Sequence, residues 1–136
     1  MQPRRIRKFD VFCNMAKELA TLSECSRLQN SAIIYTADFS AILAIGYNGP
    51  PAGSFLPCTG EEGNCGCIHA EANALVKLQQ TSRMGLQMIC TTSPCTHCAG
   101  LIINSKCLHG VYYFREYRTT TGLDRLNGAG IETRLI

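Results

Sequence analysis

The chain has 136 residues, of which 46% are hydrophobic, and this length fits one compact domain better than two independent cores. Its formal net charge of +3 is small and its basic residues are scattered, which argues against a nucleic-acid partner but is compatible with a small phosphate-bearing ligand. No apolar run approaches the roughly 18 residues of a membrane helix. The basic N-terminus is not followed by the apolar stretch of a secretory signal. We therefore expect a single intracellular domain over residues 1–136 with no membrane partner.

Hydrophobic periodicity predicts an amphipathic helix over residues 10–23, where apolar side chains recur at helical spacing. Two short runs at 31–35 and 42–47 are rich in β-branched and aromatic residues and flank a turn-like segment, which is typical of a β-hairpin. Residues 48–66 then form a long loop rich in Gly and Pro. A loop of this length is usually functional or fastened by something else.

The second half of the chain alternates helices with strands. The predicted elements are a helix over 70–79, a strand over 86–92, a helix starting at Ser93–Pro94 and continuing to Asn104, a strand over 108–114, a short helix over 119–127 and a last strand over 131–136. An initial hairpin followed by strands that alternate with helices favours an α/β fold, in which a five-stranded mixed sheet carries helices on its faces.

The nine cysteines are the most unusual feature of the composition. Without a secretory signal, such a density indicates metal binding or catalysis before it indicates disulfides. Three cysteines lie in apolar surroundings and are interpreted as buried thiols: Cys13, Cys90 and Cys107. The other six fall in two groups, namely the pair Cys95 and Cys98, and the set Cys25, Cys58, Cys65 and Cys67.

Cys95 and Cys98 are three residues apart at the predicted start of a helix, so both thiols can lie on one side of it. Pro94 suits the first turn, where its missing N–H would have had no partner. The positive end of the helix dipole favours the thiolate form that binds metals. His69 stands at the start of the preceding helix. An imidazole and two thiolates leave the fourth position of a tetrahedral zinc ion open, which is typical of a catalytic site.

Glu71 is the predicted proton carrier. Two residues along a helix turn the side chain by about 200°, so Glu71 faces the same way as His69 only if both stand at the helix start. Zinc lowers the pKa of bound water from about 15.7 to about 7. A carboxylate beside it can take the proton of that water and pass it to a leaving amine. The predicted reaction is hydrolytic loss of ammonia from an sp² carbon.

The combination His69-x-Glu71 with Pro94-Cys95-x-x-Cys98 is the signature of zinc-dependent deaminases. Each half alone is weak evidence, and together they are much stronger. The alternative is a purely structural zinc site in which Glu71 is an ordinary carboxylate on a helix surface, and in that case the chain is a non-catalytic zinc module.

Several segments of the chain resemble the cytidine/deoxycytidylate deaminase superfamily and, within it, the deoxycytidylate (dCMP) deaminases. They are Gly46–Gly53 (GYNGPPAG), His69–Ala74 (HAEANA), Ser93–Ala99 (SPCTHCA), Val111–Tyr113 with Tyr117, and Leu126 with Gly128–Ile131 (GAGI). The resemblance implies a three-layer α/β/α cytidine-deaminase-like fold. It also implies conversion of dCMP to dUMP with release of ammonia, a step that supplies thymidylate synthesis.

The resemblance assigns substrate contacts to four positions of this chain: Asn48, the backbone of Ala70, Asn73 beside the sugar or phosphate, and Tyr117 beside the pyrimidine ring. Asn48-Gly49 is equally good turn chemistry, and Tyr117 is alternatively a half-buried residue of the rim. A phosphate monoester favours an arginine fork, and Arg115, Arg118, Arg27 and Lys77 are all candidates. Of these, Arg115 enters the predicted substrate site.

The cysteines Cys25, Cys58, Cys65 and Cys67 are not needed for catalysis. Some dCMP deaminases hold a second, structural zinc with a mixture of cysteines and histidines at similar places, whereas all four ligands here would be cysteines. Four thiolates make a closed structural site. Such a site would fasten the long loop to the end of the first helix and to the helix that presents His69. Free thiols are the alternative.

Other substrates also fit the shared motifs: dCTP as well as or instead of dCMP, a free nucleoside, a purine base, or adenosine in tRNA. The family resemblance further implies a homo-oligomer, often a hexamer among relatives, with dCTP and dTTP as effectors. The Gly46–Gly53 turn resembles the region involved in that regulation. The location implied by the resemblance is the cytoplasm of a bacterium or of a phage-infected host.

Overall fold

The computed structural model describes residues 2–79 and 85–136. Its elements are α1 (Pro3–Ala20), β1 (Ser31–Thr36), β2 (Ile42–Tyr47), α2 (Ala70–Lys77), β3 (Leu86–Thr92), α3 (Thr96–Ser105), β4 (Leu108–Arg115), α4 (Thr121–Gly128) and β5 (Glu132–Leu135). This is the element order that the sequence predicts. None of the described helices combines the length and the apolar character that crossing a membrane requires.

The predicted bounds are wrong at two helix starts. Helix α1 begins at Pro3 rather than at residue 10, because Pro is well suited to the first helical position. The residues that follow Pro3 are mostly basic and show no apolar periodicity that would predict a helix. Helix α3 begins at Thr96 with Cys95 as its N-cap, so Pro94 precedes the helix instead of standing in its first turn. Elsewhere the predicted ends shift by only a few residues.

The sheet has five strands in the order β2-β1-β3-β4-β5. Strand β1 pairs antiparallel with β2 and with β3, whereas β3, β4 and β5 run parallel. The predicted mixed sheet is therefore confirmed. The parallel half follows from helices α3 and α4, which return the chain to the same end of the sheet after β3 and β4.

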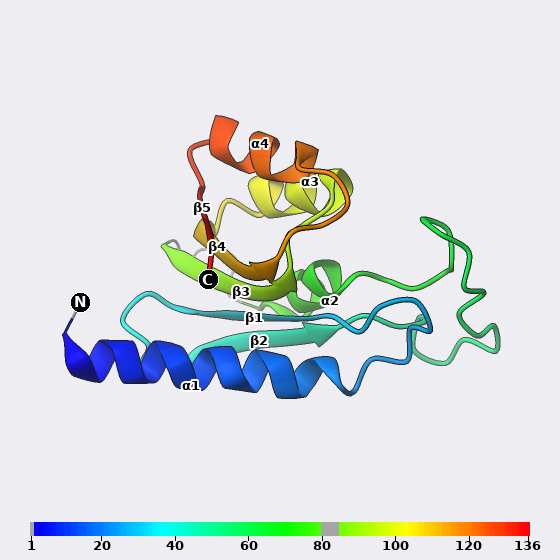
Figure 1. Ribbon diagram of the computed structural model, residues 1–136, viewed down its shortest axis with the longest axis horizontal. Coiled ribbons are helices and arrows are strands. Elements are labelled where there is room, and N and C mark those ends of the chain that lie inside the picture. Colours follow the sequence, from blue (N-terminus) through cyan, green and yellow to red (C-terminus); the bar gives the residue numbers. More distant parts are fainter. Residues whose placement is uncertain (1, 80–84) are drawn as a thin grey trace.

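The molecule has three layers, with α1 on one face of the sheet and α2, α3 and α4 on the other (Figure 1). Alternate residues of each strand serve the two faces. Ile33 and Tyr35 of β1 pack in the α1 layer, while Ala32 and Ile34 pack in the opposite core. Strand β1 is buried along its whole length, which explains why its residues 32–35 are continuously apolar rather than alternating.

Helix α2 rests directly on the backbone of β2 at Gly46. A Cβ atom at this position would lie 2.4 Å from the carbonyl oxygen of Ala70 and 2.5 Å from the amide nitrogen of Ala74. No side chain fits between the strand and the helix at such distances. The absence of a side chain at Gly46 therefore sets how close the first turn of α2 lies to the sheet.

We expect Gly46→Ala to lower the free energy of unfolding by about 1–3 kcal/mol, because backbone atoms must move to admit the methyl group. Chemical denaturation of the two proteins measures the difference. Gly100→Ala is the matched control, since that helical glycine has nothing within 4 Å of its missing Cβ. Equal destabilisation by both changes would contradict the role given to the close contact.

Candidate active site

The starts of helices α2 and α3 meet at one end of the sheet. His69 is the N-cap of α2 and Cys95 is the N-cap of α3, both with extended backbone. The chain enters α2 through a β-bridge, in which Ile68 and Gly49 exchange hydrogen bonds of 2.8 and 3.2 Å. Helix α4 supports the other start, because a Cβ atom at Gly122 would lie 2.1 Å from the carbonyl oxygen of Pro94.

The three predicted catalytic ligands converge as the sequence indicates. The Nδ1 atom of His69 lies 3.4 Å from the Sγ atom of Cys95 and 3.4 Å from that of Cys98. All three ligand atoms lie within 4.8 Å of one another. A tetrahedral zinc ion with bonds of about 2.0 Å to nitrogen and about 2.3 Å to sulfur separates its ligand atoms by roughly 3.6–3.8 Å. The donor set and its spacing therefore fit zinc.

The three side chains shift one another's pKa values. Hydrogen bonding from the Cys98 side chain, and then from His69, lowers the pKa of Cys95 to about 3, although burial opposes the shift. The same Cys95–Cys98 contact raises the pKa of Cys98, and burial adds to it. The hydrogen bond to Cys95 raises the pKa of His69. Without metal the three groups share protons, and a dication takes the place of those protons when it binds.

Glu71 lies in the first turn of α2 and is only 5% exposed. It is therefore not a helix-surface carboxylate. Burial raises its pKa from 4.5 to about 7, against the opposing effects of a hydrogen bond with Cys98 and the charge of His69. A carboxyl group with a pKa near neutrality both accepts and releases protons readily, which is what general acid–base catalysis requires.

A cavity of about 570 Å³ opens beside the three metal ligands, although the buried Cys98 is not among the described residues that line it. Its wall includes His69, Cys95 and the buried Glu71. Cavities of roughly 300–1,000 Å³ are the usual size for sites that bind small molecules. Two of the three metal ligands and the predicted proton carrier thus face a space of the right size for a nucleotide.

Three of the predicted substrate residues line the cavity: Asn48, Tyr117 and Arg115. Asn48 is 5% exposed, and both polar atoms of its side chain are hydrogen-bonded. Its Oδ1 accepts from the backbone N–H of Asn30 at 2.8 Å, and its Nδ2 donates to the carbonyl of Leu28 at 2.7 Å. This side chain therefore shapes the loop as well as the cavity wall.

Ala70 and Asn73 are not among the described residues that line the cavity. Ala70 is 1% exposed, and the Asn73 amide donates to the carbonyl of Tyr47 at 2.9 Å, where it ties α2 to the end of β2. Their contacts with substrate stay predictions.

The four candidate cations differ in surroundings. Arg118 forms an ion pair with Glu62, and Lys77 packs over the ring of Tyr47. Arg27 donates to the carbonyl of Gly60 at 3.4 Å. Arg115 also donates to neutral acceptors, with Nε 2.8 Å from the hydroxyl oxygen of Thr92. All three arginines line the cavity.

Asn30 and Thr92 also line the cavity, although no sequence motif points to them. They hydrogen-bond to each other across 62 positions of sequence, and Asn30 bonds Arg115 across 85. No local spacing indicates such contacts, because the pairing of β1 with β3 and of β3 with β4 creates them.

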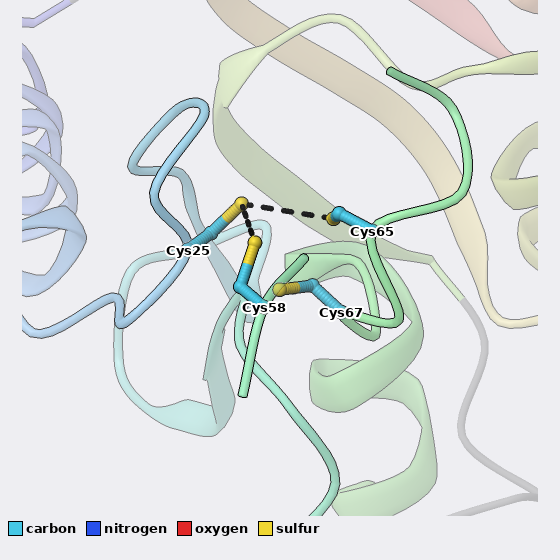
Figure 2. A group of neighbouring side chains, drawn as sticks. All are labelled: Cys25, Cys58, Cys65 and Cys67. Atoms are coloured by element: carbon cyan, nitrogen blue, oxygen red, sulfur yellow. Dashed lines mark hydrogen bonds between the residues drawn. The ribbon is translucent and has the colours of Figure 1, made fainter. Parts of the chain in front are cut away.

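Figure 2 shows the side chains of Cys25, Cys58, Cys65 and Cys67 turned toward one another. The Sγ atom of Cys25 lies 3.9 Å from that of Cys58 and 4.0 Å from that of Cys65. All four sulfurs lie within 4.8 Å of one another, close to the spacing of roughly 3.8 Å around tetrahedral zinc. Cys13, Cys90 and Cys107 are buried elsewhere, as the sequence predicts.

Comparison with known proteins identifies the family. A protein-family model described as the cytidine and deoxycytidylate deaminase zinc-binding region matches residues 7–114. The chain belongs to this family. The matched segment includes His69, Glu71, Cys95 and Cys98. The family match therefore agrees with the signature in the sequence and with the convergence of these residues in the structure.

Individual relatives carry the more specific name deoxycytidylate deaminase. The protein from Mycobacterium phage D29 is 28% identical over 76% of this chain and 91% of its own length, and that from Schizosaccharomyces pombe is 28% identical over 98% of this chain. The chain spans 46% of the length of the S. pombe relative. The dCMP deaminase of cyanophage S-TIM5, solved with dCMP and dUMP, is 35% identical over 100% of this chain and 99% of its own, with a TM-score of 0.84.

Replacing Cys98 by Ala should remove one bound zinc ion per chain, because two ligands do not hold the ion in a site built for three. Metal analysis after gel filtration measures the stoichiometry. Cys13→Ala serves as the control, since Cys13 lies outside both cysteine clusters. Unchanged zinc content in the Cys98 variant would refute the assignment of this ligand.

Proposed function

We propose that this protein is a hydrolase that converts dCMP to dUMP and releases ammonia. The observation that carries the proposal is the buried Glu71 in the cavity wall beside His69, Cys95 and Cys98. A closed structural zinc site would not need this carboxyl group or the cavity. The phage relative solved with dCMP and dUMP supports the choice of substrate.

A zinc ion held by His69, Cys95 and Cys98 would supply a water molecule whose pKa is lowered to about 7. The carboxyl group of Glu71 takes a proton from the attacking water and delivers it to the departing amino group. Oxygen is thereby added at C4 of the pyrimidine, the bond from C4 to its amino nitrogen breaks, and ammonia leaves. The buried position of Glu71 in the cavity wall beside the metal ligands allows one side chain to serve in both proton transfers.

Arg115 is the phosphate contact that we propose, and Asn48 and Tyr117 complete the substrate wall. All three line the cavity that contains Glu71. The guanidinium of Arg115 offers the fork geometry that suits a phosphate monoester. Contacts from the backbone of Ala70 and from Asn73 rest on the family resemblance alone.

We further propose a second, structural zinc ion at Cys25, Cys58, Cys65 and Cys67. These ligands come from the segment after α1 and from the long loop before α2. Hydrogen bonding from Ser26 lowers the pKa of Cys58 to about 6, which favours the thiolate form that binds metal. Because Cys67 is two residues from His69, this ion would fix the segment that delivers the catalytic histidine.

Assembly and regulation are proposed from the family resemblance: a homo-oligomer, often a hexamer among relatives, that responds to dCTP and dTTP in the cytoplasm. Phe55 is 99% exposed, Leu56 78% and Val76 84%, which supports burial of these side chains against another copy of the chain.

We expect Glu71→Gln to lower kcat for dCMP by roughly 10²–10⁴-fold, because the amide cannot carry the proton. Bound zinc and thermal stability should be retained, since the side-chain shape is preserved. Ammonia release and metal content are measured on the same samples, with Glu18→Gln on the exposed face of α1 as the control. Substantial activity in the Glu71 variant would exclude the mechanism.

For the second zinc ion, metal analysis of the wild-type protein should give two zinc ions per chain, and Cys58→Ser should give one. The loss follows from removing a thiolate from a four-ligand site. A single zinc ion in the wild-type protein, or the same content in both proteins, would contradict the proposal.

A further inference from the structure

One wall of the cavity is built around Asn30, the residue that precedes β1. Its side-chain Oδ1 accepts three hydrogen bonds: from the Thr92 hydroxyl at 2.7 Å, the Thr91 hydroxyl at 3.1 Å and Nη2 of Arg115 at 3.2 Å. A single neutral oxygen therefore links the segment before β1 to β3 and to the end of β4.

The direction of each bond follows from its neighbours. The hydroxyl oxygen of Thr92 accepts from Nε of Arg115 at 2.8 Å, so its own proton goes to Asn30. The hydroxyl of Thr91 accepts from the backbone N–H of Ser31 at 3.0 Å and donates to Asn30 in the same way. The network thus requires the oxygen of the Asn30 amide, rather than its nitrogen, at this point.

The backbone of Asn30 fixes a second residue of the cavity wall. Its N–H donates to Oδ1 of Asn48 at 2.8 Å, and the hydroxyl of the buried Ser23 lies 2.6 Å from the same oxygen. The Nδ2 atom of Asn48 donates to the carbonyl of Leu28 at 2.7 Å. Asn30 is therefore bonded both to Asn48 and to Arg115, two of the polar residues that line the cavity.

The positive charge of Arg115 is held without being neutralised. Within residues 2–79 and 85–136, two ion pairs form between side chains: Arg118 with Glu62, and Arg134 with Glu132. Glu116 also lines the cavity but makes no ion pair with Arg115 within that part of the chain. The guanidinium donates to Asn30, to the Thr92 hydroxyl and to the carbonyl of Gln29 at 3.3 Å, all of which are uncharged acceptors. Its charge is thus available to an anionic ligand.

We propose that Asn30 is a positioning residue for the phosphate of the nucleotide. Its neutral oxygen orients the guanidinium of Arg115 toward the cavity and leaves the charge of that group intact. A carboxylate at this position would orient the same guanidinium but neutralise it. The inference rests on the proposed function for the identity of the ligand as a nucleoside monophosphate.

The test compares Asn30→Asp with Asn30→Ala and the wild-type protein. Titration calorimetry with dUMP measures affinity independently of turnover. The aspartate neutralises Arg115, so dUMP should bind at least about tenfold more weakly, as expected for loss of a charge-assisted contact. Asn30→Ala removes the orienting oxygen and keeps the charge, so its loss should be smaller. Asn104→Asp, on the exposed surface of α3, makes the same change in net charge and should bind dUMP as the wild-type protein does.

A second readout is the kinetics of dCMP deamination, in which KM should rise more than kcat falls for the Asn30 variants. General damage to the fold would lower kcat, and it would not rank alanine above aspartate in dUMP affinity. Equal dUMP affinity of the wild-type and Asn30→Asp proteins, stronger binding by Asn30→Asp than by Asn30→Ala, or no binding of dUMP by the wild-type protein would overturn the proposal. If the wild-type protein binds dUMP with the predicted ranking but does not deaminate dCMP, the proposed function fails and the role of Asn30 stands.

Discussion

The active site depends on two close backbone contacts, one between the start of α2 and strand β2 and the other between α4 and the start of α3. Gly46 lets α2 lie on the backbone of β2, and Gly122 lets α4 lie against Pro94 and Cys95 at the start of α3. A side chain at either glycine would separate these backbones. The contacts place His69 and Cys95, the N-caps of α2 and α3, within reach of one ion. The positive ends of both helix dipoles then favour the thiolates and an ionised Glu71, which offsets part of the cost of burying that carboxyl group.

The long loop before α2 shares the active-site cavity with the four-cysteine cluster. Cys25, Cys65 and Cys67 line the same cavity as His69 and Glu71. The bridge between Gly49 and Ile68 and the hydrogen bonds of Asn48 hold the start and the end of this loop. A loop of this length has many conformations in the unfolded chain, so ordering it costs conformational entropy. Metal–thiolate bonds at the cysteine cluster would offset that cost and would couple the structural ion to the shape of the substrate site.

Much of the site could be predicted from the sequence because its residues occur in short local patterns. His69 with Glu71, and Cys95 with Cys98, are each separated by a few residues, and the helix starts bring the two pairs together. The order of helices and strands along the chain follows from the alternation of apolar runs with helical segments, whereas the strand order within the sheet was not predicted. In contrast, the first turns of α1 were missed because Arg4, Arg5, Arg7 and Lys8 give no apolar stripe there. Asn30 and Thr92 were missed because only the pairing of distant strands brings them to Arg115.

The measurement that tests the account most directly is ammonia release by the zinc-loaded 136-residue chain with dCMP, dCTP, deoxycytidine and CMP as separate substrates. The cavity beside His69, Cys95 and Cys98, with the uncompensated charge of Arg115 in its wall, predicts the highest kcat/KM for dCMP and a much lower value for deoxycytidine, which lacks the phosphate. Failure to deaminate dCMP, together with turnover of deoxycytidine or a purine, would contradict the account.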